Sequence, residues 1–286
     1  GPTGQVQAPA DARVFDVSGK TIVPGFVDTH AHLGLGFNIH RQPWSYLVNL
    51  AYGVTTTRDP QTGTTDVLSY EDGVTAGNIV GPRIYSTGPG VFNSTYFPGL
   101  ADDIRDLDHA RRVLRRYSEY YDTKTLKMYI AGNRQQREWI LMAAREQQIM
   151  PTTEGALDTR YDFTMAIDGY PGQEHTIPVY PYYKDVTSLY AGTGITNTPT
   201  LLVAYNGPWA ENYWYETENV YGDQKLRRFT PYEELAGKSR RRVRGQFGGG
   251  NAGGWFMRDE YGFDKQAKGA NDILKAGGRI GIGSHG

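Results

Sequence analysis

The segment Thr21-Ile-Val-Pro-Gly-Phe-Val-Asp-Thr-His-Ala-His32 decides the fold class. Its apolar residues predict a strand over residues 21–32 that ends in His30 and His32. Residues i and i+2 of a strand point to the same side, so both imidazoles project together from its carboxyl end. Active sites of α/β barrels lie at that end, and neutral imidazole is a good zinc ligand. A His-x-His pair that only makes ordinary hydrogen bonds is the alternative.

The rest of the chain alternates short apolar runs with helical patterns. Further strands are expected at 54–58, 83–87, 126–130, 150–153, 169–175, 195–202 and 279–284, and helices at 45–52, 107–121, 135–147 and 265–276. Eight strands separated by crossovers predict a parallel sheet with helices outside. A (β/α)8 TIM barrel over residues 21–286, incomplete at its C-terminus, fits that count best. A doubly wound open sheet is the alternative, although no Gly-x-Gly-x-x-Gly follows the first strand.

The composition limits the chemistry and the partners. The chain has 286 residues, a formal charge of −1 and no cysteine, which leaves His, Asp, Glu or a modified Lys to bind any metal. The balanced charge gives no reason to expect a nucleic acid or an acidic membrane as partner. No apolar run approaches the ~20 residues of a membrane span. We therefore expect no transmembrane segment or signal peptide, and the compartment stays open.

Residues 205–264 interrupt the barrel pattern. The stretch is rich in Trp, Tyr and Gly, and it holds a basic run at residues 238–244. An insertion of this length after strand seven would lie over the mouth of a barrel. We expect either a lid that forms a substrate wall or a packed surface subdomain.

Several segments resemble one known family. The stretch 19–32, Tyr52-Gly-Val-Thr-Thr-Thr-Arg-Asp59 and Gly81-Pro-Arg-Ile-Tyr-Ser-Thr-Gly88 resemble the first three barrel strands of the amidohydrolase superfamily. The resemblance is to its imidazolonepropionase- and prolidase-like branch, as found fused to TolB-like propellers, and runs from about residue 12. It implies that residues 1–20 are the tail of a small β-sandwich and that the chain is a fragment. A fused propeller domain and a homo-oligomer that covers exposed apolar surface are further expectations.

The resemblance also implies a ligand set. It assigns His30 and His32 to the metal, together with Lys127 of strand four and His175 of strand six. In related enzymes this lysine is carboxylated and bridges two metals. The cofactor implied is one or two divalent ions, with zinc favoured. Glu174, next to His175, either supports the ligands or points outward.

Two positions depart from the family pattern. Strand five normally ends in His but here carries Glu154, and strand eight normally ends in Asp but here carries His285. Both side chains bind zinc, so both are candidate ligands. They are also rival candidates for the general base, because a histidine with a pKa near 6.5 accepts a proton at neutral pH unless a metal holds it.

The resulting functional hypothesis is hydrolysis of a C–N bond in an amide, cyclic amide or peptide-like substrate by metal-activated water. Tyr129 and the loop residue His40 are the candidate substrate contacts, and His109 is expected on a solvated helix face. One alternative is a mononuclear deaminase or ester hydrolase on the same barrel. The other is a catalytically weak or inactive barrel that serves as a binding module.

Overall fold

The computed structural model describes residues 4, 8–33, 41–61, 68–91, 103–121, 123–155, 158–203, 207–240 and 255–285. Its strands form two sheets in which neighbouring strands are parallel and follow the order of the sequence. The first sheet contains β1 (Phe26–Asp28), β2 (Val54–Asp59) and β3 (Arg83–Ser86). The second contains β4 (Thr125–Met128), β5 (Met150–Thr153), β6 (Gly172–Glu174), β7 (Thr196–Thr198) and β8 (Arg279–Ile280). The predicted α/β class with parallel strands is confirmed.

Two bridges join the sheets beyond the carboxyl ends of their edge strands. Ala31 pairs with His285, and the amide of His285 donates to the carbonyl of His30 at 2.7 Å. At the other edge Val91 pairs with Met128, and the amide of Val91 donates to the carbonyl of Lys127 at 2.9 Å. The first bridge joins residues that follow β1 and β8, and the second joins a residue that follows β3 to the last residue of β4.

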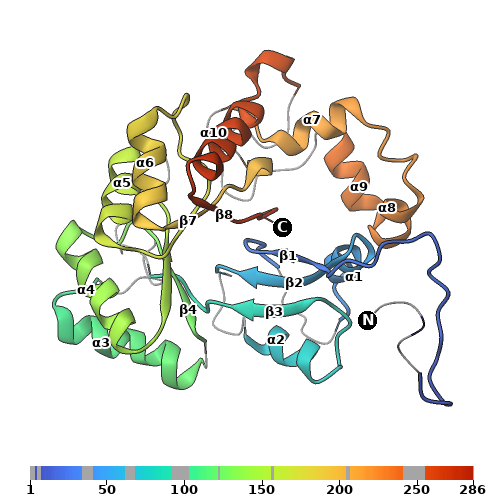
Figure 1. Ribbon diagram of the computed structural model, residues 1–286, viewed down its shortest axis with the longest axis horizontal. Helices are drawn as coiled ribbons and strands as arrows, with labels where there is room; N and C mark the ends of the chain where they lie inside the picture. The colour runs from blue at the N-terminus through green and yellow to red at the C-terminus, as the bar shows by residue number, and fades with distance from the viewer. Residues whose placement is uncertain are drawn as a thin grey trace.

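Helices cover the sheets on the outside (Figure 1). They are α1 (Trp44–Ala51), α2 (Leu68–Thr75), α3 (Leu107–Arg115), the π-helix η1 (Arg116–Tyr120), α4 (Arg134–Glu146), α5 (Thr159–Asp168), α6 (Lys184–Thr193), α7 (Ala210–Thr217), α8 (Gln224–Phe229), α9 (Tyr232–Ser239) and α10 (Phe263–Lys275), with short 3-10 turns at η2 (Leu201–Val203) and η3 (Arg258–Glu260). In the part of the chain that is described, no helix has the length and hydropathy of a membrane span.

Local sequence signals explain where several helices begin and end. Gly53 follows α1 with φ +86°, a conformation that glycine adopts without strain, and the helix ends there. Asp106 caps α3 by accepting the amide of His109 at 2.6 Å. Asn133 and Gln136 form a reciprocal capping box at the start of α4.

The core follows the division into two sheets. The larger cluster fills the space between β4–β7 and helices α3–α6, and its fully buried side chains include Leu114, Leu126, Ile140 and Ile273. The smaller cluster lies at the first sheet and contains Ala31, Leu33, Tyr46, Ile79 and Ile84. Ala31 and Leu33 flank His32, so this part of the core fixes the segment that carries the histidines.

The first and last strands are shorter than predicted. Pairing of β1 starts at Phe26, whose amide donates to Gly53, and residues 21–25 are exposed. At its other end, Asp28 accepts the amides of His30 and Ser284, which replaces regular ladder bonds by side-chain bonds. The described residues 8–20 contain no strand, so the predicted β-sandwich tail is not shown.

The described part of residues 205–264 contains α7, α8, α9 and η3. Helix α8 packs against α1, and the Tyr52 hydroxyl at the end of α1 donates to Asp223 at 2.6 Å. Residues 241–254, which include most of the predicted basic run, lie outside the described residues. This segment therefore lies partly along the side of the fold, next to α1.

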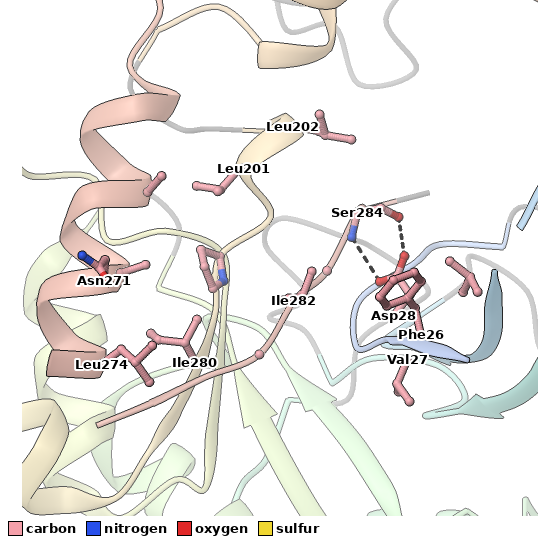
Figure 2. A pocket seen from close by; sticks show the side chains of 16 residues that line it. Phe26, Val27, Asp28, Leu201, Leu202, Asn271, Leu274, Ile280, Ile282 and Ser284 are labelled. Carbon is pink, nitrogen blue, oxygen red and sulfur yellow. Dashed lines mark hydrogen bonds between the residues drawn. The ribbon is translucent and has the colours of Figure 1, made fainter. Parts of the chain in front are cut away.

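An apolar groove of about 580 Å³ lies between β1, α10 and the segment after β8 (Figure 2). Phe26, Val27, Leu274 and Ile282 line it, and Ile282 is 78% exposed. The expectation of exposed apolar surface is thus met at this edge. The hydroxyl and amide of Ser284 hydrogen-bond to Asp28 at one end of the groove, which ties the two strand ends together (Figure 2).

Candidate metal centre

Four of the six histidines of the chain meet beyond the carboxyl ends of the strands. The ring centroid of His30 lies 5.1 Å from that of His32, 4.7 Å from that of His175 and 5.1 Å from that of His285. His30, His32 and His285 each offer a nitrogen, and these three nitrogens all lie within 4.8 Å of one another. Three imidazoles that converge in this way can surround one ion.

His30 is held by a buried charged network. Its Nδ1 lies 2.7 Å from Glu174 Oε2, and Arg58 Nη1 donates to Glu174 Oε1 at 2.7 Å. Arg58 extends from β2 to strands β4 and β5, where it donates to Thr125 and Thr152. Because a carboxylate accepts from Nδ1–H, the lone pair of His30 is on Nε2, which lies 3.3 Å from His32 Nε2.

His32 is oriented in the same way by a backbone carbonyl. Its Nδ1 hydrogen-bonds to the carbonyl of Gln61, and Asp59 Oδ1 lies 3.7 Å away. Both partners directly follow or end strand β2, so the strand pairing of β1 with β2 places them there. The Nε2 atoms of His30 and His32 thus face each other across the centre.

His285 reaches the centre because the chain after β8 passes close to β1. A Cβ atom on Gly283 would lie 2.6 Å from Cβ of His30, so only glycine fits there. His285 has φ +80°, a conformation that is rare for a side chain of this kind and that is found most often at functional sites. Its ring stacks on that of His30 at an interplanar angle of 28°.

His175 faces a different group. Its Nδ1 lies 2.5 Å from Thr200 Oγ1, and its Nε2 lies 3.4 Å from Glu154 Oε2. Its φ of +67° again lies in the left-handed region. Glu154 in turn lies 2.7 Å from Lys127 Nζ. The ring of Tyr129 lies 4.2 Å from the same nitrogen.

The electrostatics keep the two central imidazoles neutral. Burial lowers the pKa of His30 well below its usual value, although Glu174 acts in the opposite direction. Burial, followed by the neighbouring His175 and His32, lowers the pKa of His285 as well. Neutral imidazole is the form that binds a metal ion. The donor chemistry of the three converging histidines therefore fits a divalent ion such as zinc.

The carboxylates beside them are held ionised. Burial alone would raise the pKa of Glu154, but the Lys127 ammonium and His175 hold it well below its usual value. Arg58 and His30 have the same effect on the pKa of Glu174 against its burial. Burial would lower the pKa of Lys127, but Glu154, Tyr129 and Glu174 keep it above its ordinary value.

The structure brings all six predicted ligands into one region, in two groups. One group contains His30, His32 and His285, and the other contains Lys127, Glu154 and His175. Tyr129 lies beside the second group, and His40 lies outside the described residues. The roles of these side chains as ligands, base or substrate contacts stay predictions.

Sequence reasoning missed several supporting residues. The bond from Thr200 to His175, the carbonyl of Gln61 and the double acceptor role of Asp28 were not anticipated. Gln61 and Thr200 each follow the end of a strand, which is the only local signal for them. Trp209, at the start of α7, has its ring centroid 6.4 Å from that of His285, so the segment after strand seven reaches the centre.

Comparison with solved structures identifies the fold. Molinate hydrolase matches with a TM-score of 0.65 at 14% identity over 100% of this chain and 66% of its own. Bottromycin amidohydrolase matches with a TM-score of 0.61 at 18% identity, over 92% of this chain and 58% of its own. The chain shares the fold of these hydrolases. A Xaa-Pro dipeptidase with bound methionine also matches, with a TM-score of 0.58, 13% identity and coverage of 92% and 66%.

The likeness to known proteins is found by comparison of structures. No protein-family model matches the chain. No curated protein matches it either. The chain spans less than two thirds of the length of each of the solved structures named above.

Proposed function

We propose that this chain is the catalytic part of a metal-dependent hydrolase that cleaves a C–N bond. The observation that carries the proposal is the convergence of His30, His32 and His285, whose ligand nitrogens all lie within 4.8 Å of one another. Glu174 and the Gln61 carbonyl hydrogen-bond to the Nδ1 atoms of His30 and His32, as expected for histidines whose Nε2 atoms bind a metal ion. A structural role alone does not require three imidazoles to face one point.

The fold supports this assignment. We propose that the two sheets are parts of one incomplete (β/α)8 barrel, because single bridges join them at both edges. The histidines then lie at the carboxyl ends of the strands, where the active sites of such barrels are found. The ring centroid of Trp209 lies 6.4 Å from that of His285, which supports the proposal that the segment after strand seven forms one wall of the substrate site.

A bound divalent ion would lower the pKa of water to about 7 and polarise the substrate carbonyl. The chain supplies the remaining groups. Attack of water on the carbonyl carbon releases one proton, and breaking the C–N bond requires one proton on the leaving nitrogen. We assign this transfer to Glu154, whose carboxylate Lys127 and His175 hold in place. His285 is then a ligand and not the base.

The solved structures suggest the substrate class. Their names describe a Xaa-Pro dipeptidase, a molinate hydrolase and a bottromycin amidohydrolase. We propose a small amide or peptide-like substrate for this chain. Tyr129 is the described candidate for a substrate contact, next to Lys127 and Glu154.

The test starts with metal analysis of the purified chain, followed by assays with added Zn²⁺ or Mn²⁺. Xaa-Pro dipeptides and N-acyl amino acids test C–N hydrolysis, matching esters test ester hydrolysis, and amino-purines test deamination. We expect metal-dependent turnover of an amide that a chelator abolishes. A chain that binds no metal and hydrolyses none of these substrates would refute the proposal. Metal binding without turnover would support the alternative of an inactive binding module.

A further inference from the structure

The pair formed by Lys127 and Glu154 bears on how many metal ions the centre holds. Lys127 has 0% side-chain exposure, and its Nζ lies 2.7 Å from Glu154 Oε2. The ammonium group and the carboxylate form a close, buried ion pair. The ring of Tyr129 lies 4.2 Å from the same Nζ, where an aromatic face stabilises a cation.

These contacts do not fit a carboxylated lysine. Carboxylation would replace the positive charge on Lys127 by a negative one and place its oxygens next to the Glu154 carboxylate. Two buried carboxylates at that separation repel each other unless a cation lies between them. The Tyr129 ring would then also face a negative group, which its electron-rich face disfavours.

The grouping of the candidate ligands also favours a single metal ion. Among the described residues, the three histidines His30, His32 and His285 are the only set of His, Asp or Glu whose ligand atoms lie close enough to surround an ion. His175 is not part of that set, although its ring centroid lies 4.7 Å from that of His30, and its Nε2 lies 3.4 Å from Glu154 Oε2.

Each of the two buried carboxylates already has a cationic partner. Glu174 is paired with Arg58, and Glu154 is paired with Lys127. The three converging imidazoles are then the ligands of a single divalent ion, as in other zinc centres built from three histidines. A second divalent ion beside Glu154 would lie close to the Lys127 ammonium, and both charges would be desolvated there.

We infer that the centre holds one metal ion, on His30, His32 and His285, and that the Lys127 ammonium takes the place of a second cation by pairing with Glu154. This inference rests on the proposed function, since it presupposes that the histidines bind metal. It differs from the carboxylated, two-metal arrangement that the family resemblance implies.

The first experiment measures metal stoichiometry. The chain is saturated with Zn²⁺ or Co²⁺ in the presence of bicarbonate, freed of excess ion by gel filtration and analysed by plasma mass spectrometry. We expect about one ion per chain, as for mononuclear sites with three histidine ligands. Two ions per chain would overturn the inference and leave the proposed function intact, whereas none would overturn the proposed function itself.

The second experiment removes the pair without leaving an unpaired buried charge. In the double variant Lys127→Met with Glu154→Gln, we expect the same number of metal ions per chain as in the wild type. The affinity for the metal ion should fall by less than about tenfold, which is the smallest loss expected when a group that supports a metal ligand is removed. Lys124→Met, at an exposed lysine three residues earlier, is the matched control. Loss of bound metal in a folded double variant would show that Lys127 or Glu154 is a ligand.

A third measurement covers the case in which the double variant does not fold. Wild-type apoprotein is loaded with metal in buffers stripped of carbon dioxide and in buffers that contain bicarbonate. Equal uptake is expected, because an ammonium group needs no carbon dioxide. Metal uptake that depends on bicarbonate would demonstrate a carboxylated lysine and overturn the inference.

Discussion

Substitution of Glu174 by Gln tests whether the buried network positions His30 for metal binding. The two carboxylate oxygens accept from different donors, Arg58 Nη1 at Oε1 and His30 Nδ1 at Oε2, each at 2.7 Å. Glutamine keeps the shape but offers one oxygen and one NH2 group. If the oxygen stays with Arg58, the NH2 group faces His30, which must move its proton from Nδ1 to Nε2 and lose its metal-binding lone pair.

The burial of the network sets the expected magnitude. The side chains of His30 and Glu174 are 0% and 1% exposed, and that of Arg58 is 14% exposed, so water replaces little of what is lost. Loss of a group that orients a ligand typically lowers metal affinity about 10- to 100-fold. Removal of one charge from a buried network costs about 3 kcal/mol of unfolding free energy. For a chain of this size, that lowers the melting temperature by about 6 °C or more.

Zinc affinity is measured by competition with a chromophoric chelator, and stability by urea unfolding of the apoprotein. Glu138→Gln is the matched control, because Glu138 forms an exposed i,i+4 pair with Arg134 and such pairs contribute little. We expect the control to bind zinc as the wild type does. A Glu174→Gln variant with wild-type zinc affinity would refute the positioning role, even if its stability falls.

Three further predictions concern other parts of the centre. His285→Ala removes one of three converging imidazoles, so the purified variant should retain less zinc than the wild type after dialysis against a weak chelator. Gly283→Ala places a methyl group 2.6 Å from Cβ of His30, and urea unfolding should show a loss of about 1–3 kcal/mol. Asp162 is buried, and burial raises the pKa of its carboxyl to about 8. Because the unfolded chain releases this proton near pH 4, the unfolding free energy of the wild type falls as pH rises from about 4 to 8, by about 1 kcal/mol per pH unit from this group. The advantage of Asp162→Asn in urea unfolding should therefore grow from pH 5 to pH 8 and stay constant above it; an advantage that is independent of pH would contradict the raised pKa.

The alternation of strands and helices could be predicted because it depends on local pattern. The β-branched run at Val54–Asp59 forms the strand expected at 54–58, and α3 begins at Leu107, where the helix over 107–121 is expected to begin. The lengths of the first and last strands could not. Asp28 accepts amides from both His30 and Ser284, and the contact with Ser284 joins residues 256 positions apart, so no local pattern contains it.

Only the part of the site that depends on local sequence pattern could be predicted. Strand-end histidines are visible in the sequence, whereas their partners depend on the register of neighbouring strands. Lys127 lies opposite Thr152 in the β4–β5 pairing, which places Glu154 two residues further along and within reach of the ammonium. Arg58 contacts residues on three other strands, so its role is visible only once the sheets are assembled.

The two departures from the amidohydrolase pattern are physically one change. In the one-metal centre proposed above, the carboxylate of Glu154 after strand five pairs with Lys127, so that centre requires no carboxylated lysine. That arrangement leaves His30 and His32 short of a third neutral ligand on their side of the centre. A histidine after strand eight supplies it, because the bridge between Ala31 and His285 holds that residue against the first pair. The site still contains one carboxylate and one imidazole at these two positions, but the salt bridge of Lys127 and Glu154 is now separate from the three histidines. For this reason the number of metal ions per chain, more than activity, would distinguish the proposed centre from a two-metal one.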